Sequence, residues 1–308
     1  MGLSLNIYKK IFIKRFDKDG FIPYYSVEDF PGLKKIKETF INSKGNAISY
    51  FYYFYEGYRD DKIILFCHGL GPGHTAYMSE IVSLCKKGYM VLTLDYFGCE
   101  ESGGKSIYSI NSPTRDVIDL LNHLNLKMEI VLIGHSLGGY TALNVINLKK
   151  DITKAVIISG FIDIRSEMLS FIKFSFLTKE ILNFEKEVES EYFGINNLKY
   201  LKETNDKILF IHSKDDNVVP YKSTIKRLKK NKNQNLSFLI LNDRLHNPNY
   251  SKEAVDYLNK TLTAYNKMVK NNKFKSTEDR REWMRNKSLE KMTEQDEEVI
   301  DKIANFIE

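Results

Sequence analysis

The chain has 308 residues, of which 43% are hydrophobic and 28% charged, and its formal net charge is +6. A chain of this length can bury one large core, and α/β domains of this size are often single. The small basic excess is spread along the chain, which argues against a nucleic-acid partner. We find no run of about 18 uncharged apolar residues, so we expect no membrane-spanning helix.

The cysteines Cys67, Cys85 and Cys99 are odd in number, and two of them lie in or next to apolar runs. These features argue against a disulfide framework and favour a reducing compartment. The first 30 residues mix charged and aromatic side chains and contain no apolar segment typical of a signal peptide. We therefore expect a cytoplasmic protein.

The first regular elements in the chain are two β-rich runs, 38–42 and 47–55, separated by the turn sequence Ser43-Lys44-Gly45-Asn46. This pattern predicts a hairpin. Short, nearly continuous apolar runs then recur, and runs without alternation are typical of strands buried on both faces of a parallel sheet. They are residues 63–67, 90–94, 130–133, 155–158, 208–211 and 236–241.

Helical patterns alternate with these strands. One begins at Ser112 as N-cap with Pro113 at the first helical position, and its apolar face contains Val117, Leu120, Leu121 and Leu124. A second is predicted over 221–231, with a solvated basic face. The last has the apolar stripe Val299, Ile300, Ile303 and Phe306. The order predicts a single α/β domain over 1–308, with a mostly parallel central sheet and helices on both faces.

Two stretches interrupt this alternation. Residues 161–206 lie between predicted strands and are too long for a loop. Their first half is rich in large apolar side chains, so we expect a small cap insertion over the sheet. Residues 266–291 are polar and charged and contain the only tryptophan, Trp283. We expect an exposed insertion there, before the C-terminal helix.

The motif with the clearest chemistry is Gly134-His135-Ser136-Leu137-Gly138-Gly139, which follows the apolar run 129–133 and precedes a helix-prone stretch. A strand, a sharp turn with serine at its apex and a helix together form a nucleophile elbow. The turn strains the serine backbone, and Gly134 and Gly138 are expected because a Cβ there would collide with neighbouring elements.

A serine hydroxyl needs a base to take its proton and a third group to orient that base. His246 follows the strand-like run 236–241, and Asp216 follows the run 208–211. The carboxyl ends of parallel strands share one edge of a sheet, which is where Ser136 also emerges. Asp215 is the first alternative for the acid, and Asp243 is the second. We expect the backbone N–H groups of Leu137 and Leu70 to bind an oxyanion, with Gly71 as the alternative to Leu70.

With these motifs the chain resembles a serine hydrolase of the α/β-hydrolase superfamily, near its esterase, monoglyceride-lipase-like and cinnamoyl-esterase-like branch. The matching motifs are His68-Gly69, Asp95-Tyr96-Phe97-Gly98, the Ser136 elbow and Asp216-x-x-Val219-Pro220, with His246 in the place of the family's histidine. The resemblance spans about residues 38–264 and the last helix. It implies acyl transfer to water through an acyl-serine intermediate, with no cofactor and no metal.

The predicted substrate is a small-to-medium carboxylic ester with an apolar acyl or aryl group. Phe171, Phe174 and Phe176 of the 161–206 segment are the predicted pocket residues. A thioesterase, an amidase or peptidase, and a carbon–carbon hydrolase would use the same three residues, so all remain open. A binding or receptor module that keeps the fold, and a membrane-surface role for the basic N-terminus, are the further alternatives.

The remaining histidines have structural interpretations. We expect His68 and His135 to support the turns in which they lie, and His212 to be buried at a strand end. His74 is expected to be an exposed loop residue, with a place in the pocket as its alternative.

Overall fold

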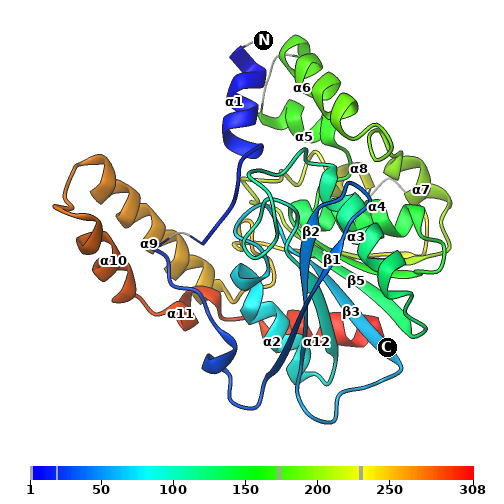
Figure 1. Ribbon diagram of the computed structural model, residues 1–308, viewed down its shortest axis with the longest axis horizontal. Helices are drawn as coiled ribbons and strands as arrows, with labels where there is room; N and C mark the ends of the chain where they lie inside the picture. Colours follow the sequence, from blue (N-terminus) through cyan, green and yellow to red (C-terminus); the bar gives the residue numbers. More distant parts are fainter. Residues whose placement is uncertain (1–2, 19, 172–174, 229–231) are drawn as a thin grey trace.

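A computed structural model describes residues 3–18, 20–171, 175–228 and 232–308. Its centre is an eight-stranded sheet in the order β1-β2-β4-β3-β5-β6-β7-β8 (Figure 1). β1 and β2 pair antiparallel, β2 pairs antiparallel with β4, and the strands from β4 to β8 are parallel. The strands are β1 Lys34–Ile41, β2 Ala47–Phe54, β3 Lys62–Cys67, β4 Met90–Leu94, β5 Glu129–His135, β6 Lys154–Ile158, β7 Lys207–Ser213 and β8 Leu236–Leu241.

Each strand predicted from an apolar run is present, and the predicted hairpin is confirmed. Ile41 pairs with Ala47 across the turn, and Asn42 closes it by donating its N–H to the Asn46 carbonyl at 2.9 Å. Gly45 has φ +76°, a conformation that glycine adopts without steric cost.

Helices cover both faces of the sheet, as predicted. α3 (Ser112–Leu124) and α4 (Leu137–Leu148) pack on one face, and α2 (Met78–Lys86) and α12 (Glu297–Ile307) pack on the other. β3 divides its side chains between the two layers, because successive residues of a strand point to opposite faces. Ile63, Leu65 and Cys67 join the α3–α4 core, and Ile64 and Phe66 join the α2–α12 core.

Helix boundaries differ from the sequence prediction at two places. Asn111 is the N-cap of α3, so Ser112 and Pro113 fill its first two helical positions. The helix predicted over 221–231 is shorter: α8 is Ile225–Leu228, turns follow Pro220, and residues 229–231 lie outside the described residues. Arg227 is also not simply solvated, because it forms an ion pair with Asp163 at 2.8 Å.

Residues 161–206 contain α5 (Ile164–Phe171), α6 (Ser175–Val188) and α7 (Asn197–Glu203). The N-terminal helix α1 (Leu3–Phe12) lies beside α6, above the sheet (Figure 1). Two short 3-10 helices, η1 (Val27–Asp29) and η2 (His74–Tyr77), lie in loops.

The segment between β8 and α12 begins with a loop over 242–251 and is largely helical after it. It contains α9 (Lys252–Lys270), α10 (Thr277–Arg285) and α11 (Leu289–Thr293), and α9 and α10 project to one side of the sheet (Figure 1). Trp283 packs against the rings of Tyr265 and Phe274 there. Cys67, Cys85 and Cys99 are buried free thiols. Within the described ranges, no helix is both long and apolar enough to cross a membrane.

Candidate active site

Ser136 occupies the turn between β5, which ends at His135, and α4, which begins at Leu137. Its backbone has φ +57° and ψ −118°, a strained conformation for a residue with a side chain. Two hydrogen bonds hold the turn: Ser136 N–H donates to the Ile158 carbonyl at 2.9 Å, and Tyr140 N–H donates to the Ser136 carbonyl at 3.1 Å. This geometry is the sharp strand-to-helix turn that the sequence predicts.

The glycines beside Ser136 are required by close backbone packing. A Cβ on Gly134 would lie 2.1 Å from the Gly138 carbonyl oxygen, and one on Gly138 would lie 1.9 Å from the Cys67 carbonyl oxygen. Both distances are shorter than any real contact, and backbone atoms cannot move aside as a flexible side chain can. The predicted reason for glycine at these positions is therefore confirmed.

The loops after β7 and β8 bring Asp216 and His246 together. His246 Nδ1 lies 3.0 Å from each carboxylate oxygen of Asp216. The N–H groups of Val218 and Val219 both donate to Asp216 Oδ1 at 2.9 Å, which fixes the carboxylate. Asp216 is buried, so its orientation depends on these partners.

The two alternative acids lie elsewhere. Asp215 accepts a hydrogen bond from the Ser213 hydroxyl, and Asp243 is 70% exposed and forms an ion pair with Lys252. The structure therefore pairs His246 with Asp216 rather than with Asp215 or Asp243.

Burial by itself would raise the pKa of Asp216, yet its pKa lies below the ordinary aspartate value. The hydrogen bond and the charge interaction with His246 lower it, and His212, 3.4 Å away, lowers it further. The carboxyl group is therefore ionised at neutral pH. An ionised acceptor at Nδ1 directs the His246 proton to that nitrogen and leaves Nε2 as the basic atom.

The side chain of His135 holds the His246 loop through a hydrogen bond to its backbone. Burial lowers the pKa of His135 to about 3, so the ring is neutral. Its Nε2 lies 2.8 Å from the His246 carbonyl, which can only accept, so Nε2 carries the proton. Nδ1 then accepts from the Tyr77 hydroxyl at 3.0 Å. His135 therefore has a structural role, as predicted: it links the His246 backbone to the Tyr77 side chain.

Ser136 and His246 line the same cavity, whose volume is about 240 Å³. Leu70 and Leu137 line it as well, and no hydrogen bond among the described residues uses the N–H of either. Among the described residues, Ser136 Oγ makes no hydrogen bond to His246, and such catalytic bonds often form only when substrate binds. The other lining residues are Phe12, Ile110, Phe161, Glu167, Met168, Val218 and Val219.

Sequence reasoning missed Glu167, a carboxyl group in this mostly apolar cavity. Its side chain is buried, and burial, together with the charges of Asp216 and Asp163, raises its pKa to about 8. It also missed Phe12, because nothing in the local sequence of α1 shows that this helix packs above the sheet. Phe161 could have been found, since it closely follows the carboxyl end of β6.

The predicted pocket phenylalanines are not placed by the structure. Phe174 lies outside the described residues, and Phe171 and Phe176 are placed only as backbone positions at the end of α5 and the start of α6.

The expectation for His74 is wrong. It is fully buried and bonded to Asp95 and Tyr53, because Asp95 at the end of β4 faces the loop that follows the neighbouring strand β3. Among the described residues, no group of three or more metal-ligating side chains is close enough to hold an ion.

Comparisons with known proteins agree with this architecture. The family model described as "Serine aminopeptidase, S33" matches residues 59–188. A 2-hydroxy-6-oxo-6-(2'-aminophenyl)hexa-2,4-dienoic acid hydrolase from Metapseudomonas resinovorans is 22% identical over 233 residues, which cover 62% of this chain and 79% of that protein.

Solved structures extend the likeness to most of the chain. An esterase from Pyrococcus furiosus has a TM-score of 0.58 at 20% identity and covers 84% of this chain and 97% of its own. Est1E from Butyrivibrio proteoclasticus, solved with ferulic acid bound, has a TM-score of 0.56 at 16% identity and covers 68% and 90%. The chain therefore shares its fold with these proteins.

Proposed function

We propose that this chain, which has the α/β-hydrolase fold, is a serine hydrolase that cleaves a small-to-medium carboxylic ester through an acyl-serine intermediate. The observation that carries the proposal is the contact between Asp216 and His246, made at a cavity that Ser136 also lines. A nucleophile on a strained turn, a histidine with one nitrogen held by a buried carboxylate, and a shared cavity are the parts that acyl transfer requires.

In the proposed mechanism, Ser136 Oγ attacks the acyl carbon while His246 Nε2 takes the hydroxyl proton. His246 then donates that proton to the leaving alcohol, and the acyl group remains on Ser136. Water attacks the acyl-serine next while His246 takes its proton, and His246 returns that proton to Ser136 Oγ as the acyl–oxygen bond breaks and the acid is released. Asp216 holds the imidazole in the required tautomer and stabilises its positive charge.

The backbone N–H groups of Leu70 and Leu137 are the proposed oxyanion donors. Both residues line the cavity beside Ser136, and neither N–H donates to another described residue. Gly69 also needs to be small, because a Cβ there would lie 2.3 Å from the Tyr77 hydroxyl and 3.2 Å from the His135 carbonyl. One such donor is worth roughly 3–4 kcal/mol of transition-state stabilisation.

The cavity supports a compact, mostly apolar acyl or aryl group. A volume of about 240 Å³ is below the range of about 300–1,000 Å³ typical of drug-sized ligands. Its walls come partly from the 161–206 segment, through Phe161 and Met168, and partly from α1, through Phe12. We propose that this segment acts as the cap that limits acyl size. Est1E, solved with ferulic acid, has the same fold, and this favours aryl esters in a substrate panel.

The proposal is tested by labelling the full chain with a fluorophosphonate probe and mapping the modified residue by mass spectrometry. We expect modification of Ser136 only, complete loss in Ser136→Ala, and normal labelling in the control Ser166→Ala. Labelling at another serine, or turnover retained in Ser136→Ala, would contradict it.

A second assay determines which class of bond the protein cleaves fastest. Esters, thioesters, anilides and dienoic acids of matched size are compared by kcat/KM, and the proposal expects esters to be cleaved fastest. A preference for anilides would favour the peptidase chemistry that the matched family's description indicates. A preference for dienoic acids would favour the chemistry named for the Metapseudomonas relative.

A further inference from the structure

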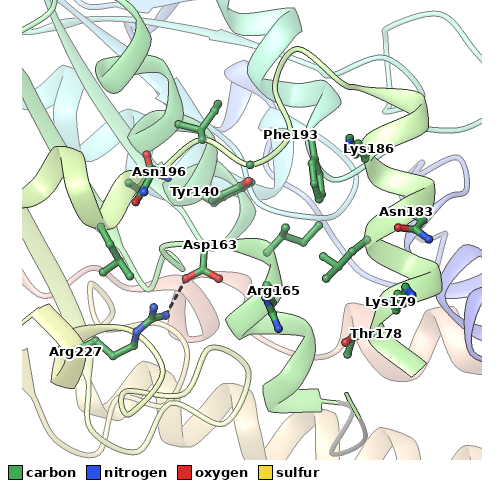
Figure 2. Close-up of a pocket in the computed structure, with 16 residues that line it drawn as sticks. Tyr140, Asp163, Arg165, Thr178, Lys179, Asn183, Lys186, Phe193, Asn196 and Arg227 are labelled. Atoms are coloured by element: carbon green, nitrogen blue, oxygen red, sulfur yellow. Dashed lines mark hydrogen bonds and ion pairs between the residues drawn. The ribbon is translucent and has the colours of Figure 1, made fainter. Parts of the chain in front are cut away.

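A second and larger cavity lies beside the catalytic one, among α5, α6, the loop before α7, and Arg227 (Figure 2). Its volume is about 940 Å³. We call it the basic groove, because Arg165, Lys179, Lys186 and Arg227 line it and Asp163 is the one acid among its lining residues. Its remaining polar lining includes Asn183 and Asn196 (Figure 2).

The basic character of the groove comes from one face of α6. Lys179, Asn183 and Lys186 are spaced i, i+4 and i+7, so a helix places them along one side. All three are exposed and line the groove, and Figure 2 shows them across from Asp163 and Arg227.

Two acids at this end of α6 point away from the groove and are already paired. Glu185 is buried, accepts from the Tyr8 hydroxyl of α1 and accepts from Asn111 Nδ2 at 2.9 Å. Glu189, just after the helix, is buried against Arg115. The fold therefore buries Glu185 and Glu189, and the other acids of α6, Glu180 and Glu187, are exposed but do not line the groove.

The acid of the groove is also paired. Asp163 binds Arg227 at 2.8 Å, and its other oxygen accepts from the Ser166 N–H at 2.7 Å at the start of α5. Among the described residues, Arg165, Lys179 and Lys186 form no ion pair. The groove therefore holds about three uncompensated positive charges at neutral pH.

The groove also has an apolar surface, which could contact the hydrocarbon part of an organic anion. Ile164, Leu182, Phe193 and Leu198 line it, together with the ring of Tyr140. That ring stacks on Phe161 with centroids 4.4 Å apart, and Phe161 lines the catalytic cavity. The groove and the catalytic cavity therefore share a wall of two stacked rings.

We propose that the basic groove binds a small organic anion, in which a carboxylate or phosphate meets the lysine and arginine side chains and an aromatic or aliphatic body packs on the apolar surface. This site is separate from the ester-cleaving site and goes beyond the proposed function. The same chemistry could come from an independent molecule or from the acid group of a long substrate, and the experiment below separates these two sources.

Calorimetric titration of the full chain with phenyl phosphate tests the proposal, with phenol as the uncharged control ligand. We expect one molecule of phenyl phosphate to bind and phenol to bind at least tenfold more weakly. Lys179→Ala/Lys186→Ala should weaken phenyl phosphate binding by about tenfold or more, because charge-assisted contacts are lost. Raising the salt concentration from about 0.02 M to 0.2 M should weaken binding as well.

The matched control is Lys267→Ala/Lys270→Ala on α9, which removes the same charge from exposed positions on another part of the molecule. It should bind phenyl phosphate as the parent does. Equal affinity in the parent and in Lys179→Ala/Lys186→Ala would overturn the proposal, as would equal weakening in both double variants. Arg165→Gln provides a second test and should also weaken binding.

A titration of protein whose catalytic serine has been blocked by a fluorophosphonate shows which cavity holds the phenyl phosphate. Unchanged phenyl phosphate affinity in the blocked protein supports a separate groove that an independent molecule can occupy. Complete loss would place the anion in the catalytic cavity and overturn the proposal. Competition in which only esters bearing a distal carboxylate displace phenyl phosphate would assign the groove to the substrate's own acid group. The titrations of the parent and of the lysine and arginine variants need no reactive serine, so failure of the proposed function would be seen separately.

Discussion

Among the described residues, two histidines contact an aspartate through Nδ1 at nearly equal distances, in different surroundings. His246 Nδ1 lies 3.0 Å from Asp216, and His74 Nδ1 lies 2.8 Å from Asp95. His246 is 17% exposed and lines the cavity with Ser136, whereas His74 is 0% exposed. The two histidines also differ at their second ring nitrogen. His74 Nε2 is hydrogen-bonded to the Tyr53 hydroxyl at 2.9 Å, whereas His246 Nε2 is bonded to no described residue.

This comparison shows that contact with a carboxylate does not make a histidine a catalytic base. In both pairs burial raises the pKa of the acid and the histidine contacts lower it below the ordinary value. What differs is whether the second nitrogen can reach a substrate. Asp95 instead joins loops: it accepts from the His74 N–H at 2.8 Å and from the Glu101 N–H at 3.1 Å.

The largest expected effect on activity comes from substituting His246, in the pair that lines the catalytic cavity. His246→Gln removes the proposed base, and kcat should fall by roughly 10⁴-fold or more, as in other enzymes of this type. The free energy of unfolding should change by less than about 1 kcal/mol, because the Gln amide can still donate to Asp216 and the carboxylate keeps its hydrogen bonds from Val218 and Val219. Steady-state kinetics and urea unfolding measure the two quantities. A loss of activity that matched a loss of folded protein would contradict this prediction.

The next effect separates the neighbouring acids. Asp216→Asn should lower kcat by about 10⁴-fold, because the amide no longer fixes the His246 tautomer or stabilises its charge. Asp215→Asn serves as the control and should cost less than about tenfold, since that carboxylate bonds Ser213 instead. The reverse ranking would reject the role proposed for Asp216.

How far the sequence could predict this arrangement depends on the range of the contacts. Ser136 lies in a local strand–turn–helix pattern with glycines at defined positions, so its place follows from nearby residues. Asp216 and His246 follow strands of a parallel sheet, so their meeting follows from topology. His74 was misjudged because its burial depends on Asp95, 21 residues away, and on Phe51, whose ring stacks 3.9 Å from it.

The 161–206 segment was predicted even less completely. Its length and apolar content indicated an insertion. The pairing of Glu185 and Glu189 could not be foreseen, because their partners Tyr8, Asn111 and Arg115 come from distant parts of the chain.

A stability effect is expected at the second pair. His74→Leu leaves Asp95 buried without the imidazole, so the free energy of unfolding should fall by about 3 kcal/mol at pH 7. Ester turnover by the folded variant should change less than about tenfold, because the residue has no contact with the cavity. Urea unfolding and kinetics at a temperature where the variant is folded measure both. Unchanged stability would show that the buried pair is not structural.

The pH dependence of this effect has a definite sign. The folded-state pKa of Asp95 is lowered, so its ionised form stabilises the protein above the unfolded-state pKa of about 3.9, and this contribution is lost as pH falls. The difference in stability between the parent and His74→Leu should therefore shrink between about pH 5 and pH 3. A difference that grew toward low pH would contradict the assigned ionisation state.

The smallest effect is expected from Tyr53→Phe, which removes only the hydroxyl bonded to His74 Nε2. The unfolding free energy should fall by about 1 kcal/mol, the usual net value of one hydrogen bond, with little change in turnover. Thermal and urea unfolding would detect it, and Tyr58→Phe at an exposed position is the matched control.

The central claim, that only one of the two pairs serves Ser136, is tested most directly by the rate of fluorophosphonate labelling of Ser136. The rate is measured side by side in the parent, His246→Gln and His74→Leu. We predict that His246→Gln slows labelling by about 10³-fold or more, because the hydroxyl loses its base, while folded His74→Leu stays within about fivefold of the parent. Equal slowing in the two variants, or unchanged labelling in His246→Gln, would contradict the account.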